Sequence, residues 1–234
     1  MSATENNYSN IVKDLTKRHF KNSKNNGKKI VVGLGSGSTV ATLIREMDLF
    51  KKRDKFEFIT TSIQIKNIAD KIGLSFTDES KINELDIVLD GADQIDHDLN
   101  MIKGGGGALF NEKILIYSSK KTIIFANQNK FVKKFTRTIP VEVHPFARYS
   151  VEKKIKKMNT KVNLRTLDKG YPIMTENGNI ILEIMFNNLP RDIKKLEEDL
   201  KNIPGVIEVG IFSMMKNTYY YLIDKNKIHT KMKK

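Results

Sequence analysis

The 234-residue sequence contains no cysteine, which excludes disulfide scaffolds, thiolate nucleophiles and zinc sites with cysteine ligands. It also lacks long hydrophobic runs: the apolar stretches at 30–34 and 114–117 are far too short to cross a membrane. The first ten residues are polar and show no apolar signal core, so we expect a cytoplasmic protein without a membrane partner. Apolar residues make up 39% of the chain, which excludes a disordered or fibrous protein.

The net charge of +14 is concentrated in the second half of the chain. Residues 1–117 carry 17 basic and 16 acidic side chains, whereas residues 118–234 carry 24 and 11. Lysine outnumbers arginine by 34 to 7, although surfaces that read nucleic-acid bases usually favour arginine with aromatic residues interleaved. We therefore interpret the excess as solvated lysine faces and expect no nucleic-acid partner. A weak attraction for polyanions stays open.

Short apolar runs alternate with helical spacing over about the first 135 residues. This alternation is typical of an α/β fold, in which a mostly parallel sheet carries helices on both faces. Strands are expected at 29–34, 56–60, 86–90 and 121–126, and helices at 39–50, 63–72 and 108–118.

After Pro140 the order becomes strand, helix, strand, strand, helix, strand, which is that of a smaller α+β ferredoxin-like domain. We predict an α/β domain at 1–138, completed by a returning segment at 211–234, and the α+β domain at 139–210. The lysine-rich end, 225–234, is expected to be a frayed tail. In the second domain, strands are expected at 141–143, 161–165, 179–185 and 206–212, and helices at 146–158 and 191–201.

The first motif, Gly33-Leu-Gly-Ser-Gly-Ser-Thr39, connects a predicted strand to a predicted helix. Its glycines allow a tight turn that directs backbone N–H groups toward one point. Ser36, Ser38 and Thr39 add hydroxyl groups at a helix N-terminus, where the dipole favours an anion. Ser38 replaces the third glycine of the dinucleotide fingerprint, and no Walker Gly-Lys-Ser/Thr follows. The motif therefore predicts a monophosphate site that includes Gly37, the alternative being a capped turn without a ligand.

The second motif, Asp90-Gly-Ala-Asp93-Gln-Ile-Asp96-His-Asp98, begins where a buried strand should end, at the edge that open α/β sheets use for ligands. Gly91 and Ala92 lack bulk, so Asp90 and Asp93 could approach one small molecule together. Two close carboxylates do not both ionise easily, and one can then hold a proton for acid/base chemistry. A cation loop is the alternative, but the calcium-loop spacing is not met, and we expect no metal.

The third motif, Lys103-Gly-Gly-Gly-Gly107, precedes a predicted helix that contains Glu112. Four consecutive glycines cost much conformational entropy, which indicates a function. We infer an amide nest for developing negative charge, with Lys103 beside it and Glu112 pointing back toward it. The alternatives are a flexible linker and an ordinary exposed helix pair of Glu112 and Lys113.

Together the three motifs predict one site with an anion cradle, a carboxylate pair and an oxyanion nest with a base. In this order they resemble the signature of the type A ribose-5-phosphate isomerase family. The resemblance extends over nearly the whole chain. It is carried by Gly-Ser-Gly-Ser-Thr39, Asp-Gly-Ala-Asp93, Lys-Gly-Gly-Gly-Gly-Ala-Leu, Asn-Glu-Lys-Ile114, Pro140-Val-Glu-Val143, Asn177-Gly-Asn179 and Ile203-Pro-Gly-Val206.

The resemblance implies an isomerase of the non-oxidative pentose phosphate pathway, a homodimer or homotetramer that needs no cofactor or metal. It would interconvert ribose 5-phosphate and ribulose 5-phosphate through an enediolate. By motif match, Glu112 would move a proton between C2 and C1. Lys103, with the amides of Gly104, Gly105 and Gly106, would stabilise the enediolate. Asp90 and Asp93 would open the furanose ring. Further substrate contacts would be Ser36, Gly37, Ser38, Thr39, Gly91, Ala92, Gly104, Gly105, Gly106, Lys130 and an N-terminal lysine, for which Lys13 is our choice.

One departure from the family pattern is Gln94, where relatives commonly have glutamate, which removes one negative charge beside the acid pair. The leading alternative function is a non-catalytic sugar-phosphate-sensing domain, which needs the phosphate loop but no base. A nucleotide-dependent oxidoreductase is disfavoured by Ser38 and by the phosphate-sized loop.

Overall fold

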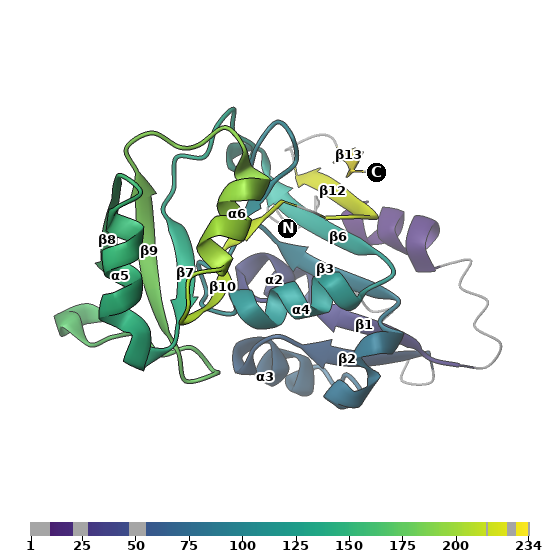
Figure 1. The fold of residues 1–234 in the computed structure, drawn as a ribbon. Coiled ribbons are helices and arrows are strands. Elements are labelled where there is room, and N and C mark those ends of the chain that lie inside the picture. The colour runs from purple at the N-terminus through teal and green to yellow at the C-terminus, as the bar shows by residue number, and fades with distance from the viewer. Residues whose placement is uncertain (1–9, 21–27, 47–54, 214, 224–227, 234) are drawn as a thin grey trace. The chain divides into compact units, whose positions relative to one another are not determined.

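The computed structural model describes residues 10–20, 28–46, 55–213, 215–223 and 228–233, and it divides into two compact units (Figure 1). Each unit is assembled from segments that are far apart in the sequence. Unit 1 consists of Met1–Gly91, Ile114–Asn129 and Lys216–Lys234, and unit 2 of Ala92–Lys113 and Lys130–Met215.

Unit 1 contains a six-stranded sheet in the order β13-β12-β6-β3-β1-β2. Every neighbouring pair is parallel except β12 and β13, which confirms the predicted mostly parallel sheet. Leu34 pairs with Leu89, so β1 and β3 end side by side. The strands are β1 (Ile30–Leu34), β2 (Phe56–Thr60), β3 (Ile87–Gly91), β6 (Thr122–Asn127), β12 (Thr218–Ile223) and β13 (Ile228–Lys233).

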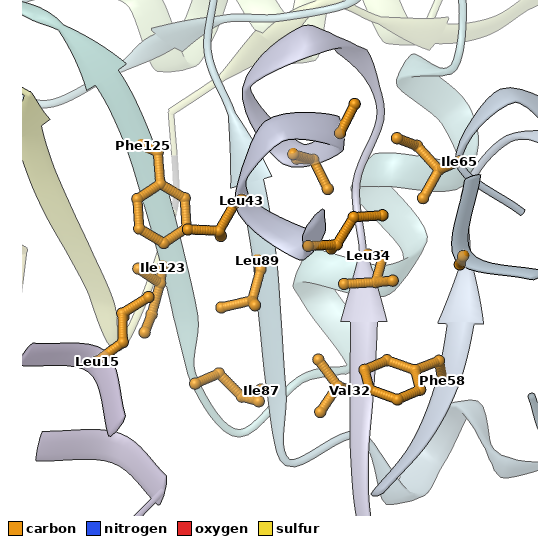
Figure 2. Close-up of a cluster of buried hydrophobic side chains, with 14 of the residues drawn as sticks. Leu15, Val32, Leu34, Leu43, Phe58, Ile65, Ile87, Leu89, Ile123 and Phe125 are labelled. Carbon is orange, nitrogen blue, oxygen red and sulfur yellow. The ribbon is translucent and has the colours of Figure 1, made fainter. Parts of the chain in front are cut away.

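Helices cover both faces of this sheet, as predicted. On one face, Leu43 and Ile65 project from helices onto Leu34 and Leu89 in a continuous apolar cluster (Figure 2). The opposite face packs against a third helix, whose Leu115 would lie 3.3 Å from a β-carbon added at Gly33 of β1. Among the described residues, no helix is long and apolar enough to cross a membrane. The three helices are α2 (Gly37–Glu46), α3 (Ile63–Lys71) and α4 (Leu109–Ser118).

Unit 2 contains a four-stranded antiparallel sheet in the order β10-β7-β9-β8, which is the predicted ferredoxin-like arrangement. Val141, Leu182 and other alternate residues pack against two helices on one face. The strand registers place Glu142 opposite Glu208, with Glu183 on the same face of the sheet. The second face therefore carries three glutamates, together with the buried Ile181. The elements are β7 (Ile139–Val143), α5 (Arg148–Lys156), β8 (Thr160–Leu164), β9 (Ile180–Phe186), α6 (Ile193–Lys201) and β10 (Val206–Val209).

The predicted strand at 206–212 is wrong in one respect, because it breaks at Gly210 into two strands of different sheets. The Gly210 N–H donates to the Pro140 carbonyl at 2.7 Å, and its own carbonyl accepts from the Lys103 N–H at 2.9 Å. A β-carbon at this position would lie under 3.0 Å from the Lys103 carbonyl. The chain then continues in a three-stranded sheet of order β11-β5-β4: β11 (Ile211–Phe212), β5 (Met101–Ile102) and β4 (Gln94–Ile95).

The C-terminal end also differs from expectation, because residues 228–233 form β13 against β12 instead of a frayed tail. Residues 225–227 and 234 of that predicted tail, like the predicted helix end at 47–50, lie outside the described residues. The contact-based division places 92–113 and 130–138 with the antiparallel sheet, whereas the sequence assigned them to the first domain. Where independently folding domains begin and end stays a prediction.

Candidate active site

The predicted phosphate loop of unit 1 runs from the end of β1 into the first turn of α2. Gly37 has a φ of 87°, a conformation that side chains rarely adopt, and an added β-carbon would meet nothing within 4 Å. Gly37, Ser38 and Thr39 are the first three residues of α2. Their N–H groups have no partner within the helix and lie at the positive end of its dipole. The loop therefore has the backbone arrangement that suits an anion.

Asp90 is buried beside this loop and is the second-last residue of β3. The Asp90 side chain has 0% exposure, and its Oδ1 accepts from the Gly91 N–H at 2.7 Å. A β-carbon at Gly35 would lie under 3.0 Å from the Asp90 carboxylate, so only glycine leaves room for it there. A β-carbon at Gly91 would lie 3.8 Å from Thr39 Cβ. Unit 1 thus brings the start of α2 and the carboxylate together at the carboxyl ends of β1 and β3.

The glycine run, Gly104–Gly107, belongs to unit 2 and forms a defined turn. Gly104 and Gly107 have φ values of 104° and 84°, and the Gly107 N–H donates to the Gly104 carbonyl at 3.0 Å. The Gly105 N–H donates to Asp93 Oδ2 at 2.8 Å. The run is therefore held by side-chain and backbone hydrogen bonds, which argues against a flexible linker.

The two aspartates of the predicted pair belong to different units: Asp90 to unit 1 and Asp93 to unit 2. The structure shows Asp90 against the phosphate loop and Asp93 against the glycine run. That both approach one small molecule stays a prediction.

Glu112 and Lys103 form a buried ion pair in unit 2. Lys103 Nζ lies 3.0 Å from Glu112 Oε2, and each side chain is only 3% exposed. Glu112 lies in the first turn of α4, where its N–H donates to the Ala108 carbonyl at 2.9 Å. The alternative of an ordinary exposed helix pair is therefore excluded for Glu112. A carboxylate can accept a proton and an adjacent ammonium can stabilise an anion, so two parts of the predicted chemistry lie side by side.

Lys113, the next residue of α4, is bound to a second set of buried groups. Its Nζ donates to Glu197 Oε1 at 2.6 Å, Glu208 Oε1 at 2.8 Å, and the carbonyls of Val209 and Ile211 at 2.7 and 2.8 Å. Burial alone would raise the pKa of Glu208, but the Lys113 ammonium and hydrogen bonds hold that pKa below its ordinary value. Sequence reasoning missed this cluster, which anchors the helix that carries Glu112.

Gln94 is buried in unit 2 and uses both ends of its amide. Its Nε2 donates to Thr136 Oγ1 at 2.7 Å, and its Oε1 accepts from the N–H groups of Thr136 and Arg137 at 2.9 and 3.0 Å. A glutamate could accept the same backbone bonds, but it could not donate to the threonine as the amide does. The glutamine therefore fastens the 136–137 segment to the strand that follows Asp93.

The remaining predicted residues are placed as follows. Lys13 is exposed on the helical residues 10–15 of unit 1. Lys130 is half-buried at the end of a short 3-10 turn, Gln128–Lys130, and Ala92 is also half-buried. Their substrate contacts stay predictions.

The acidic motif does not gather into a metal-ligand cluster among the described residues, where no group of three His, Asp or Glu side chains is placed to hold an ion. Asp96 instead accepts from the backbone N–H and the Nδ2 of Asn100, at 2.8 and 2.9 Å.

Comparison with known proteins gives one consistent family. Residues 57–226 match the family model of ribose 5-phosphate isomerase A (phosphoriboisomerase A). The chain is 39% identical over 193 residues to ribose-5-phosphate isomerase A of Methanosarcina acetivorans, covering 81% of this chain and 82% of that protein. The solved structure of ribose 5-phosphate isomerase A from Methanocaldococcus jannaschii aligns with a TM-score of 0.85 at 32% identity, covering 98% and 99%. A D-ribose-5-phosphate isomerase in complex with phospho-erythronic acid aligns with a TM-score of 0.86 at 29% identity, over the same shares.

Proposed function

The chain belongs to the ribose 5-phosphate isomerase A family, and we propose that it interconverts ribose 5-phosphate and ribulose 5-phosphate, as in the non-oxidative pentose phosphate pathway. The observation that carries the proposal is the ion pair of Lys103 and Glu112, both 3% exposed, in which Lys103 directly precedes the glycine run. Burying two charges costs several kcal/mol of desolvation before their attraction offsets it, so such a pair is expected where chemistry requires it. A sugar-phosphate sensor would need only the loop.

The phosphate of the substrate would bind at the start of α2. The N–H groups of Gly37, Ser38 and Thr39, which have no partner within the helix, would supply donors together with the Ser36 hydroxyl, as in phosphate sites at helix N-termini. Lys13 and Lys130 would add positive charge. Remote binding of this kind lets phosphate recognition contribute to positioning the reacting carbons.

Ring opening would be the first chemical step. One of Asp90 and Asp93 would take the proton of the C1 hydroxyl while the other gives a proton to the ring oxygen, which breaks the C1–O4 bond and produces the open aldehyde. Asp90 is fully buried and Asp93 is hydrogen-bonded to the glycine run, so the two carboxylates have different environments. Such a difference separates acid from base.

Proton transfer between carbons would follow. Glu112 would take the C2 proton, the electron pair would form the C1–C2 double bond, and the negative charge would move to O1. Lys103 and the amides of the glycine run would stabilise this enediolate. Glu112 would then return the proton to C1 while the O2 proton moves to O1, which gives the ketose.

Phospho-erythronic acid provides a probe of this assignment, because a relative of this chain was solved in complex with it. Its carboxylate carries charge where the enediolate develops it. We expect competitive inhibition with tighter binding than ribose 5-phosphate, as for other analogues of high-energy intermediates.

The direct test is turnover of ribose 5-phosphate by the wild-type protein in D₂O, with and without a chelator. We expect ribulose 5-phosphate to form at the same rate in both, with deuterium appearing in substrate and product. Unphosphorylated ribose serves as the control and should react far more slowly. Binding of ribose 5-phosphate without turnover or exchange would instead indicate a sensor. The predicted homodimer or homotetramer is checked separately by light scattering.

A further inference from the structure

Arg165 joins the glycine run to the antiparallel sheet of unit 2. It follows β8, and its backbone N–H donates to the Ile181 carbonyl of β9 at 2.8 Å. Its Nη1 donates to the carbonyls of Gly104 and Gly105, at 2.8 and 3.2 Å. Its Nε donates to Glu183 Oε1 at 2.6 Å, and Nη2 forms an ion pair with the same oxygen. The guanidinium therefore lies between one carboxylate and two peptide carbonyls.

This position matters because the glycine run has no side chains with which to hold its own conformation. Glycine loses more backbone entropy on ordering than any other residue, and the two central glycines are exposed. Asp93 holds the amide side of the turn through the Gly105 N–H. Arg165, whose side chain is only 14% exposed, holds the carbonyl side.

The same contacts also strengthen the amides as donors. A cation that is hydrogen-bonded to a peptide carbonyl withdraws electron density, so the N–H of that peptide becomes a better donor. The Gly104 carbonyl shares its peptide with the Gly105 N–H, and the Gly105 carbonyl shares its peptide with the Gly106 N–H. Arg165 therefore acts on two amides: that of Gly105, which donates to Asp93, and that of Gly106, which belongs to the predicted nest.

We propose that Arg165, oriented by Glu183, is a positioning residue that orders the glycine run and polarises the amide of Gly106 for the developing enediolate. This inference rests on the proposed function. The rival interpretation is that Arg165 only neutralises Glu183. Lysine separates the two, because it keeps the charge beside Glu183 but has no planar fork to bind a carboxylate and two carbonyls together.

The experiment compares Arg165→Lys with the wild type and with Arg191→Lys, which changes an exposed arginine of the same unit. One oxyanion donor is worth about 10²–10³ in kcat, and an indirect role predicts a loss of at least about 10-fold. We expect that loss in kcat for Arg165→Lys, with KM and the thermal unfolding midpoint close to those of the wild type. Amide hydrogen exchange over Gly104–Gly107 should become faster. Arg191→Lys should match the wild type.

A second variant keeps the proposal testable if the Arg165→Lys protein folds poorly. Arg165→Ala should lose more kcat than Arg165→Lys. Guanidinium added below denaturing concentrations should restore part of this kcat, and it should leave the kcat of Arg191→Ala unchanged. Wild-type kcat in Arg165→Lys with unchanged hydrogen exchange would overturn the proposal. So would a loss in Arg165→Ala that follows unfolding and is not restored by guanidinium. If the wild-type protein itself does not turn over ribose 5-phosphate, the proposed function fails, and hydrogen exchange still reports whether Arg165 orders the glycine run.

Discussion

Glu112 and Lys113 are consecutive residues of α4, yet each is bound to ionic partners from a different segment of unit 2. Glu112 pairs with Lys103 at 3.0 Å, whereas Lys113 donates to Glu197 and Glu208 at 2.6 and 2.8 Å. All of these side chains are at most 10% exposed. Lys113 therefore anchors α4 at the position next to Glu112, the base of the proposed reaction.

Lys113→Met should destabilise the protein strongly, because it leaves the carboxylates of Glu197 and Glu208 buried without their shared cation. Removing one partner of a buried ion pair typically lowers the free energy of unfolding by about 3–5 kcal/mol. Urea unfolding followed by circular dichroism measures the loss. Lys194→Met, which removes an exposed lysine of α6, is the control and should change little. A loss for Lys113→Met as small as that of the control would refute the structural role.

Gly35→Ala should inactivate the protein by displacing Asp90 rather than by unfolding it. The added methyl group would lie under 3.0 Å from the Asp90 carboxylate, which is the end of a side chain and can rotate away. If Asp90 serves ring opening, kcat should fall by about 10²-fold, the lower range for a general acid or base. Steady-state assays with ribose 5-phosphate measure this, and Arg45→Ala, at the exposed end of α2, is the matched control. Full activity in Gly35→Ala would mean that the position of Asp90 is unimportant.

His19 makes the stability of unit 1 depend on pH. Burial lowers the pKa of His19 to about 4, with the Lys121 ammonium adding to the effect and Asp14 opposing it. The unfolded chain takes up this proton near the ordinary pKa of 6.5, so it binds more protons than the folded protein between pH 6.5 and 4. The free energy of unfolding should therefore fall as the pH is lowered through this window.

His19→Phe tests this dependence, because it keeps an aromatic ring beside Tyr219 but removes the titrating group. The wild type should lose free energy of unfolding relative to the variant between pH 6.5 and 4, with the difference constant above pH 7.5. Urea unfolding at a series of pH values gives both curves. Two curves that stay parallel across the window would show that His19 does not titrate differently in the folded state.

Much of unit 1 could be predicted from the sequence because its signals are local. The β-branched run at Ile30–Leu34 enters a glycine turn, and the apolar spacing of the next residues specifies the helix that follows. The split βαβ order of unit 2 could be predicted in the same way, because the apolar residues of each strand and helix repeat with the period of that element. Glu112 was predicted as the base from its place in the helix after four glycines and from the match to the family motif, and the structure adds its contact with Lys103.

The missed features depend on contacts between residues far apart in the chain. Lys113 meets partners 84 to 98 residues away, and Arg165 meets the glycine carbonyls 60 and 61 residues away. Strands β4 and β5 have two residues each, too few to show a period. The break at Gly210 follows from the close approach of the Lys103 carbonyl, which no pattern around residue 210 indicates.

The most direct test of the proposed mechanism is the rate at which the C2 hydrogen of ribose 5-phosphate exchanges with D₂O in the presence of Glu112→Gln. The substitution keeps the shape of the side chain and removes its ability to take a proton. We predict an exchange rate at least about 10²-fold below that of the wild type, with an unchanged circular dichroism spectrum. Exchange by a folded Glu112→Gln protein at close to the wild-type rate would contradict the assignment of Glu112 as the base.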